Sequence, residues 1–332
     1  MAVTPISEST SVPAPSAEEK IRRPSGLLLG ACLTLILLLW SVNYTAGKIA
    51  LRHMGPLTLV SLRIELAAIL MLTIHFLRRD RARFQRRDLW TFVYLGFLGV
   101  ALNQGCFMAG LNYTTSERSV LVKAVGPILI LVFARALKLE AFTASKIAGM
   151  ILAFFGVLLL EAEGGRLGHT PMAVGDGITL VSTLGFAIYS VLGKRVLNSP
   201  RTGKYDAISM NTFITAAAGV MLLPLAVEQA ATIRWTSVGW VGWSGLVYMA
   251  AGSSVGAYTL FYWVLKHLDA SRVAAINYIQ PFLVIVLSML FLGEHPTGHL
   301  ISGGALVLIG VYFVERMSVG SARLKESEGP GA

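Results

Sequence analysis

The feature that most constrains the fold of this chain is a series of long apolar runs separated by short basic clusters. Runs of roughly 20 apolar residues match the hydrocarbon thickness of a bilayer, and their continuity is typical of membrane helices rather than of barrel strands. Only 14% of the 332 residues are charged, against about a quarter in soluble domains. We therefore expect an all-α polytopic membrane protein with ten transmembrane helices. The predicted helices cover 26–50, 57–77, 89–111, 118–137, 144–162, 173–194, 207–227, 237–264, 272–292 and 297–317.

The placement of Lys and Arg predicts how the chain is oriented. With the N-terminus in the cytoplasm, twenty-one basic residues fall on the cytoplasmic side and five on the far side. We therefore expect a multi-pass protein of a bacterial-type inner (plasma) membrane with both termini cytoplasmic. The net charge of +10 does not indicate a nucleic-acid partner, because the basic residues lie at the ends of apolar runs. The expected partners are the lipid bilayer and a small-molecule substrate, and we expect a monomer.

The sequence repeats itself at a spacing of 154 residues. This shift superposes 114–140 on 268–294, and a shift of 146 superposes the Gly-Lys dipeptide at 47–48 on the one at 193–194. The identities at the first spacing pair Arg118 with Arg272, Pro127 with Pro281, Glu140 with Glu294, Gly149 with Gly303, Gly156 with Gly310 and Glu161 with Glu315. Each half holds five predicted helices, an odd number, so the two halves must have opposite orientations. This predicts an inverted repeat, the layout of many transporters, with the site near the midplane.

The two ends of the chain differ in composition from the rest. The first two dozen residues are rich in Ser, Pro and Glu, and they lack the basic start and cleavage site of a signal peptide. We expect a disordered cytoplasmic tail at 1–25, a first five-helix repeat at 26–163, a second at 173–317 and another disordered cytoplasmic tail at 318–332.

Several stretches resemble those of a known family. They are WSVNYTAGK (40–48), the segments SERSVLVKAVGP and ASRVAAINYIQP with their prolines, and LGEHPTGHLISGGALVLIGVYFV (292–314). These resemble the EamA-type branch of the drug/metabolite transporter superfamily over roughly 26–317. The first copy departs from the pattern in LKLE (137–140), where the family usually has Gly before the Glu. The resemblance implies ten helices, no ATP hydrolysis and usually export of amino acids or other metabolites. Among members, the chain looks most like the aromatic amino acid exporters.

Polar and aromatic residues at paired positions are candidates for lining a pathway between the halves. In the first predicted helix, Trp40 and Asn43 share a face by i, i+3 spacing. The substrate-binding candidates are Trp40, Asn43, Gln104, Met108, Lys123, Tyr189, Tyr258, Tyr262, Asn277 and Tyr278. Aromatic rings suit the flat face of an apolar substrate, and asparagine can bind its amino or carboxylate group. The alternatives are an interfacial aromatic belt and helix–helix hydrogen bonds.

Lys123 is the most specific of these candidates, because a cation at membrane depth needs a partner, a watery cavity or an anionic ligand. One interpretation is a counter-charge for a substrate carboxylate. The alternatives are an ion pair with Glu65 or Glu117, or extension of the side chain to the outer face. Glu65 is a candidate proton-coupling carboxylate or a member of an interhelical pair. We expect Arg63, near the start of its helix, in the outer interface.

Pro127 and Pro281 are candidate hinges, because a proline frees a carbonyl one turn earlier in a helix, although a static kink explains them equally well. Cys32 and Cys106 have no partner at metal-ligand spacing, which indicates packing thiols. No P-loop, HExxH, GxSxG or paired-carboxylate motif occurs in a plausible context, so we expect no enzyme, no catalytic residue, no metal and no cofactor.

The hypothesis that follows is a secondary transporter that exports small metabolites, in particular aromatic or other apolar amino acids, by alternating access. The alternatives are an importer or exchanger of the same fold, and an intramembrane enzyme or receptor.

Overall fold

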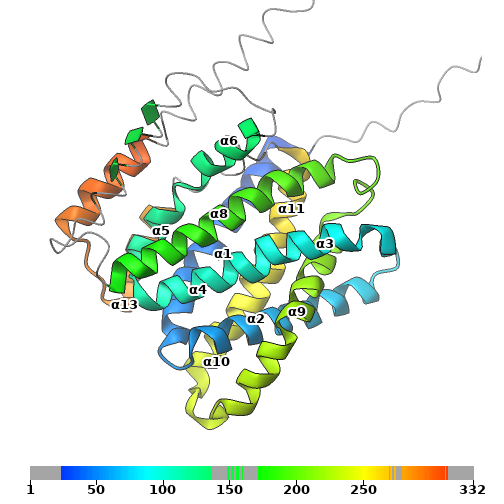
Figure 1. Cartoon of the computed structure of the whole chain (residues 1–332), viewed down its shortest axis with the longest axis horizontal. Helices are drawn as coiled ribbons and strands as arrows, with labels where there is room; N and C mark the ends of the chain where they lie inside the picture. Colours follow the sequence, from blue (N-terminus) through cyan, green and yellow to red (C-terminus); the bar gives the residue numbers. More distant parts are fainter. Residues whose placement is uncertain are drawn as a thin grey trace, which may run out of the picture.

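The chain folds into a bundle of helices (Figure 1). The computed structural model describes residues 24–136, 171–268 and 279–310, with isolated positions at 148–149, 151–152, 155–156, 159, 270, 273 and 312. Within these residues all regular structure is helical. The predicted tails, 1–25 and 318–332, lie outside the described part except for residues 24–25. The elements are α1 (Gly26–Leu51), α2 (Pro56–Leu77), η1 (Arg86–Asp88), α3 (Leu89–Gly96), η2 (Phe97–Leu102), α4 (Asn103–Tyr113), α5 (Ser116–Lys123), α6 (Gly126–Ala136), α8 (Pro171–Leu197), α9 (Ala207–Thr232), η3 (Trp235–Ser237), α10 (Gly239–Tyr248), η4 (Met249–Ala257), α11 (Tyr258–His267) and α13 (Gln280–Leu292).

Five stretches of helix in the described part of the chain are long and apolar enough to cross a membrane. They are Gly26–Leu51, Pro56–Leu77, Arg86–Tyr113, Pro171–Leu197 and Ala207–Thr232. Two shorter apolar helices, Gln280–Leu292 and Gly298–Gly310, follow near the end. Large apolar side chains such as Leu27, Trp90 and Trp240 lie exposed on the outside of the bundle. A surface of this kind is unfavourable in water and suits the hydrocarbon of a bilayer.

The predicted single helix at 118–137 is wrong in one respect. The regular α-helix is interrupted by a turn at residues 124–125, which separates α5 from α6. Pro127 is the second residue of α6, and a proline is tolerated in a first helical turn, where its missing N–H leaves no bond unmade. Most of the helix predicted at 144–162 lies outside the described residues.

Helices far apart in the sequence make the most extensive contacts, α2 with α9 and α4 with α8. Figure 1 shows α8, α4 and α2 running side by side. Between α4 and α8 the backbones touch at two glycines. A Cβ atom on Gly110 would lie 2.7 Å from the Gly175 carbonyl oxygen, and one on Gly175 would lie 2.8 Å from the Gly110 carbonyl oxygen. In lipid, where no hydrophobic drive holds helices together, close packing at small residues takes its place.

Two of the helical stretches contain a π-helical segment. In one, η2 joins α3 to α4, and in the other, η4 joins α10 to α11. Such segments interrupt the regular hydrogen-bond ladder and are frequent at functional sites. Here they precede Asn103 and Tyr258, the first residues of α4 and α11, whose side chains both reach the cavity described below.

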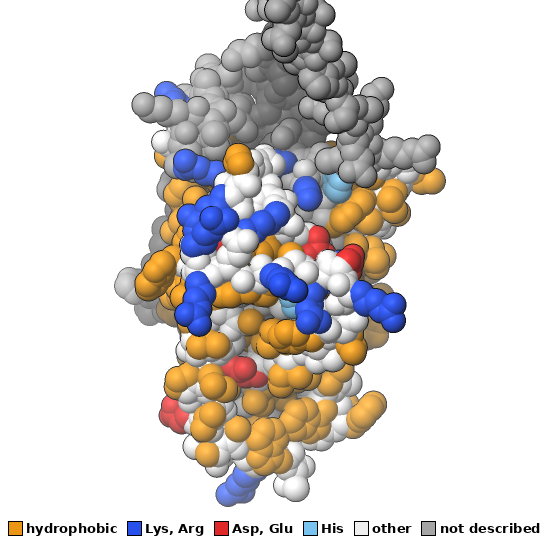
Figure 2. All heavy atoms as spheres, turned by 90° about the vertical axis from the view of Figure 1, so that its right-hand side faces the viewer, with side chains coloured by type: hydrophobic (Ala, Val, Ile, Leu, Met, Phe, Trp, Pro, Cys, Tyr) orange, Lys and Arg blue, Asp and Glu red, His pale blue; other side chains and the backbone are white. Residues whose placement is uncertain are grey.

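Basic side chains gather at one end of the bundle. Figure 2 shows this face, which lies on the right of Figure 1, where the loops after α2 and α8 come together. Asp88 is fully buried beneath it. Its carboxylate accepts hydrogen bonds from Arg201 Nε at 2.6 Å and from the Tyr205 hydroxyl at 2.8 Å. These bonds tie the loop before α3 to the loop after α8.

Candidate functional site

A cavity of about 60 Å³ lies inside the bundle. Its lining residues are Trp40, Asn43, Tyr44, Arg63, Asn103, Gln104, Phe107, Lys123, Gly126, Thr183, Phe186, Ser253, Tyr258 and Gln280. They come from both halves of the chain. About 10–15 Å³ is enough for one water molecule, whereas benzene occupies a cavity of about 150 Å³. The cavity therefore has room for a few water molecules, and it must widen to admit an aromatic amino acid.

Lys123, the last residue of α5, extends its ammonium group to one wall of the cavity. Its Nζ atom lies 3.3 Å from Asn103 Oδ1 and 3.0 Å from Ser182 Oγ. It also lies 5.1 Å and 6.0 Å from the ring centroids of Phe107 and Phe186, within the range of cation–π attraction. These neighbours replace only part of the hydration shell of an ammonium ion, and all of them are neutral.

Neither of the carboxylates expected to pair with Lys123 does so. Glu117 instead accepts a hydrogen bond of 3.1 Å from Ser288 Oγ. Glu65 faces α9, where a Cβ atom on Gly219 would lie 3.3 Å from its Oε2 atom. Among the described residues, no carboxylate forms an ion pair with Lys123. Within the described part of the chain, this charge is left for water to solvate or for a ligand in the cavity to balance.

Arg63 of α2 is a second buried cation in the lining. Its Nε atom donates to Ser254 Oγ and its Nη2 atom to Ser253 Oγ, both at 3.1 Å. The Nη1 atom is buried and has no hydrogen-bond partner. The prediction that Arg63 lies in the outer interface is wrong, since its side chain is only 1% exposed. The reason is that two serine hydroxyls of η4 solvate the guanidinium inside the bundle.

Aromatic rings form the apolar part of the cavity. The indole of Trp40 lies 5.8 Å from the ring of Phe186 and 5.5 Å from that of Tyr258, both in edge-to-face arrangements. Phe107 completes this wall and packs on Tyr44 at 4.9 Å. Such edge-to-face contacts hold the rings at fixed angles. The cavity thus offers an apolar surface directly beside the ammonium group of Lys123.

Hydrogen bonds hold the polar lining in place. The Asn103 amide donates to the Tyr258 hydroxyl at 2.9 Å, and its Oδ1 atom accepts from Ser182 Oγ at 2.9 Å. By contrast, Asn43 Oδ1 and the Tyr44 hydroxyl are buried without a partner. Buried polar atoms are nearly always bonded to protein or to ordered water. These two atoms can therefore bind water or a ligand in the cavity.

Of the predicted substrate-binding residues, Trp40, Asn43, Gln104, Lys123 and Tyr258 line the cavity. The remaining predicted residues either lie outside the lining or fall outside the described part of the chain. Met108, Tyr189 and Tyr262 are fully buried outside the lining, and Asn277 and Tyr278 lie outside the described residues.

The two predicted hinge prolines begin helices beside the cavity. Pro127 follows Gly126, and Pro281 follows Gln280, and both preceding residues belong to the lining. Each proline is thus the second residue of its helix, α6 or α13.

Sequence reasoning missed Arg63, Asn103, Phe107 and Ser253 as lining residues. The Asn-Gln pair at 103–104 and the Ser-Ser pair at 253–254 were the available signals, because each is a polar dipeptide inside an apolar run. Among the described residues, no group of three His, Cys, Asp or Glu side chains is placed to hold a metal ion.

The sequence pattern of the EamA-like transporter family matches residues 26–161 and again residues 173–316. The chain belongs to the EamA-like transporter family. It is thus a membrane transporter, and the cavity lies inside the helix bundle of such a protein.

Relatives of this EamA-like transporter carry names that mention amino acids. A "Probable terminal-alkyne amino-acid exporter" of Streptantibioticus cattleyicolor is 25% identical over 90% of this chain and 96% of its own length. A "Probable amino-acid metabolite efflux pump" of Salmonella typhimurium is 25% identical over 85% of this chain and 93% of its own. An "Uncharacterized transporter" of Archaeoglobus fulgidus is 26% identical over 86% of this chain and 97% of its own. A crystal structure at 20% identity has the same fold, with a TM-score of 0.62 over 88% of this chain and 98% of that chain.

Proposed function

We propose that this EamA-like transporter is a secondary transporter that exports amino acids or closely related metabolites, with aromatic or other apolar side chains, across the inner membrane. The observation that carries the proposal is the ammonium group of Lys123 beside aromatic rings in a buried cavity. The names of two relatives, an amino-acid exporter and an amino-acid metabolite efflux pump, support the same substrate class.

The cavity provides one kind of group for each part of such a substrate. Lys123 would bind the carboxylate, because its present neighbours, Asn103 and Ser182, are neutral. Trp40 and Phe107 would pack against an apolar side chain. The unpartnered Oδ1 atom of Asn43 would accept a hydrogen bond from the substrate.

Ten helices in two inverted repeats, at 26–163 and 173–317 with both termini cytoplasmic, are part of the proposal. Two lysines that match at a spacing of 146 residues support it. Lys48 Nζ donates to the Leu111 carbonyl at 2.8 Å and to the carbonyl three residues later. Lys194 Nζ donates to the Leu265 carbonyl at 2.8 Å and, again, to the carbonyl three residues later. The first helix of each half is thus fixed to the end of its third helix in the same way.

Contacts between the two halves lie near opposite ends of α8 and support the proposal of alternating access. At one end, Arg118 of α5 forms a buried ion pair with Asp176 of α8 at 2.6 Å. At the other end, Arg201 bonds Asp88 at 2.6 Å. Transport requires that one set of contacts separates while the other stays closed. Pro127 and Pro281, at helix starts beside the cavity, are the proposed hinges.

The test is uptake of labelled phenylalanine and tryptophan into liposomes that contain the purified protein. We expect saturable uptake that Lys123→Met and Trp40→Ala abolish. The matched controls are Lys266→Met and Trp90→Ala, because both wild-type side chains are exposed on the outside. Absence of flux for every amino acid would contradict the substrate class.

Proton coupling is tested in the same liposomes with an imposed pH gradient. If Glu65 carries the coupling proton, a gradient accelerates wild-type uptake and has no effect on Glu65→Gln. Equal acceleration of both proteins would exclude Glu65 from this role.

A further inference from the structure

The charge of the cavity indicates the net charge of the cargo as well as the presence of a carboxylate. We propose that the preferred cargo carries a net negative charge, with Arg63 as a second anion-binding group opposite the Lys123 site, so that a zwitterionic amino acid is not the best ligand. This inference rests on the proposed function and moves the preferred cargo, within its substrate class, from amino acids to closely related carboxylates without a compensating ammonium group.

Arg63 supplies the first step. Its guanidinium stays protonated in proteins, so its positive charge is permanent. The side chain is 1% exposed and lines the cavity, and its Nη1 atom has no hydrogen-bond partner among the described residues. The serine hydroxyls of η4 satisfy only Nε and Nη2. A buried donor on a charged group that is left unbonded is strongly unfavourable, and an anion in the cavity would satisfy it.

The second step concerns counter-charges. Among the described lining residues, Arg63 and Lys123 are cations and no residue is acidic. Outside the lining, Asp176 is bound to Arg118, Glu117 accepts a hydrogen bond from Ser288, and Glu65 faces Gly219 of α9. The described cavity therefore has an excess of positive charge.

The third step concerns the position of the two cations. Lys123 contacts Asn103, and Arg63 contacts Ser254, whose hydroxyl in turn donates to Gln104 Oε1 at 3.4 Å. Asn103 and Gln104 are adjacent in α4, so the two cations are held at the same level of the bundle. A ligand that fills the cavity at this level meets both charges.

The two cations in the lining favour some ligand charges over others. The ammonium group of a zwitterion would enter a low-dielectric cavity that already holds two cations, and like charges repel strongly there. A monoanion compensates one of the cations, and a dianion compensates both. The apolar rings of Trp40 and Phe107 require that the rest of the cargo be apolar.

The experiment uses four ligands with the same phenyl and propionyl skeleton. They are phenylalanine amide, phenylalanine, 3-phenylpropionate and benzylmalonate, whose net charges at neutral pH run from plus one to minus two. Binding to the purified full-length protein in detergent is measured by titration calorimetry at low ionic strength, which avoids leakage of weak acids through a membrane. We expect affinity to increase in the order given, with benzylmalonate at least about tenfold tighter than phenylalanine.

Variants assign this preference to Arg63. Arg63→Gln should remove the advantage of benzylmalonate over 3-phenylpropionate, whereas Arg63→Lys should keep it, because the charge is retained. Arg234→Gln is the matched control, because Arg234 is exposed in a loop. If Arg63→Gln fails to fold, the order of ligand affinities in the wild type and in Arg63→Lys still tests the inference.

Three outcomes would overturn the inference. They are equal or tighter binding of phenylalanine compared with benzylmalonate, an unchanged order in Arg63→Gln, and no binding of any of the four ligands. The liposome assay distinguishes these from failure of the proposed function, because saturable amino acid flux that depends on Lys123 would leave that function in place.

Discussion

A Cβ atom on Gly99 would lie 2.2 Å from the ring of Tyr189, so the π-helical segment η2 and helix α8 touch where η2 presents no side chain. Tyr189 is fully buried, and its ring centroid lies 5.9 Å from that of Phe186, which lines the cavity. The glycine thus sets the position of a ring that supports the aromatic wall.

Gly99→Ala should therefore displace Tyr189 and lower the stability of the protein. Overpacking a tight contact costs about 1–3 kcal/mol. The control is Gly105→Ala in α4, where an added Cβ atom would meet no atom within 4 Å. This control should be neutral or slightly stabilising, because alanine is the better helix former. The apparent Tm of both variants is measured in detergent. Equal Tm values would show that α8 shifts to accommodate the added methyl group without loss of stability.

Lys48→Met and Lys194→Met should lower the apparent Tm by similar amounts. Each change leaves two carbonyl oxygens without their donor, and an unsatisfied buried acceptor costs about 1–3 kcal/mol. Lys266→Met is the control, because Lys266 lies exposed at the end of α11. A loss of stability in only one of the two variants would mean that the two lysines have unequal roles, against the proposed repeat.

The sequence was sufficient to predict the helical class, the family and part of the cavity. Apolar runs and basic flanks depend on the bilayer alone, and these signals do not require knowledge of tertiary contacts. Trp40 and Asn43 were found because a helical face repeats every three to four residues, and both line the cavity. Arg63 was misplaced because its solvation comes from Ser253 and Ser254, about 190 residues later in the chain.

Helical spacing identifies a face but does not identify its neighbour. Met108 lies one turn after Gln104, yet only Gln104 reaches the cavity. The Met108 methyl group packs at the position of Gly47, where a Cβ atom would lie 3.3 Å away. Tyr262 is likewise covered by Tyr189 and Phe261. Only the packing of α1 and α8 against these helices decides which residues face the cavity.

Lys123→Met should abolish transport without lowering stability. The methionine has a similar shape, and the described residues give Lys123 no carboxylate partner, so its replacement by an apolar group leaves no buried counter-charge among them. Asn103 and Ser182 keep their mutual hydrogen bond after the change. Tm and liposome flux are measured on the same preparation. A lower Tm with retained flux would assign a structural role to Lys123.

In contrast to Lys123→Met, a change in the ion pair between Arg118 and Asp176 should lower the stability of the protein. Both side chains are buried, and Asp176 also accepts a bond of 2.6 Å from Thr114 Oγ1. Loss of one partner of a buried ion pair costs about 3–5 kcal/mol. Asp176→Asn should therefore lower Tm sharply, and Asp80→Asn, on an exposed carboxylate, should not.

A double replacement tests this interpretation. Arg118→Met combined with Asp176→Leu removes both charges and should recover part of the stability that either single change loses. Additive losses in the double variant would mean that the two residues stabilise the protein through other contacts.

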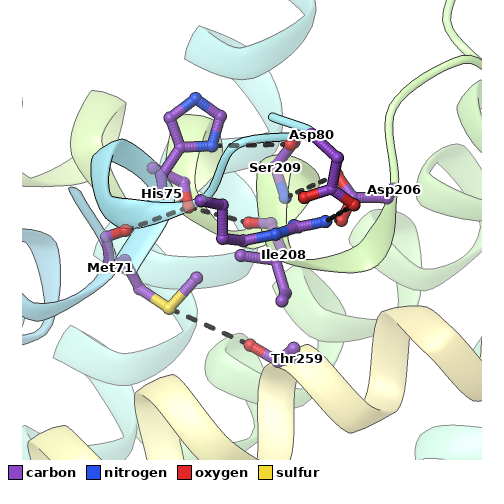
Figure 3. A network of polar contacts seen from close by, with 9 residues as sticks. Met71, His75, Asp80, Asp206, Ile208, Ser209 and Thr259 are labelled. Carbon is purple, nitrogen blue, oxygen red and sulfur yellow. Dashed lines mark hydrogen bonds and ion pairs between the residues drawn. The ribbon is translucent and has the colours of Figure 1, made fainter. Parts of the chain in front are cut away.

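Asp206 predicts a dependence of stability on acid pH. Figure 3 shows Asp206 at the start of α9, beside Ser209. Its carboxylate accepts a hydrogen bond from the Ser209 amide and forms an ion pair with Arg78. Partial burial acts to raise the pKa of the Asp206 carboxyl, but the hydrogen bonds from Ser209 and Arg78 outweigh it and hold the pKa below its usual value. The ionised carboxylate therefore stabilises the fold above about pH 4, the value of an unfolded aspartate.

This contribution should disappear as the pH falls below about 4 and through the lowered folded-state pKa of Asp206. Because the side chain is 40% exposed, the effect is small, and we expect at most about 2–4 °C of Tm. Tm is measured from pH 6 to pH 3 in the wild type, Asp206→Asn and the control Asp80→Asn. Asp206→Asn should be less stable at pH 6 and should lose less stability towards pH 3, because no charge remains to be neutralised. Parallel Tm profiles in all three proteins would show that the acid dependence arises from other carboxylates.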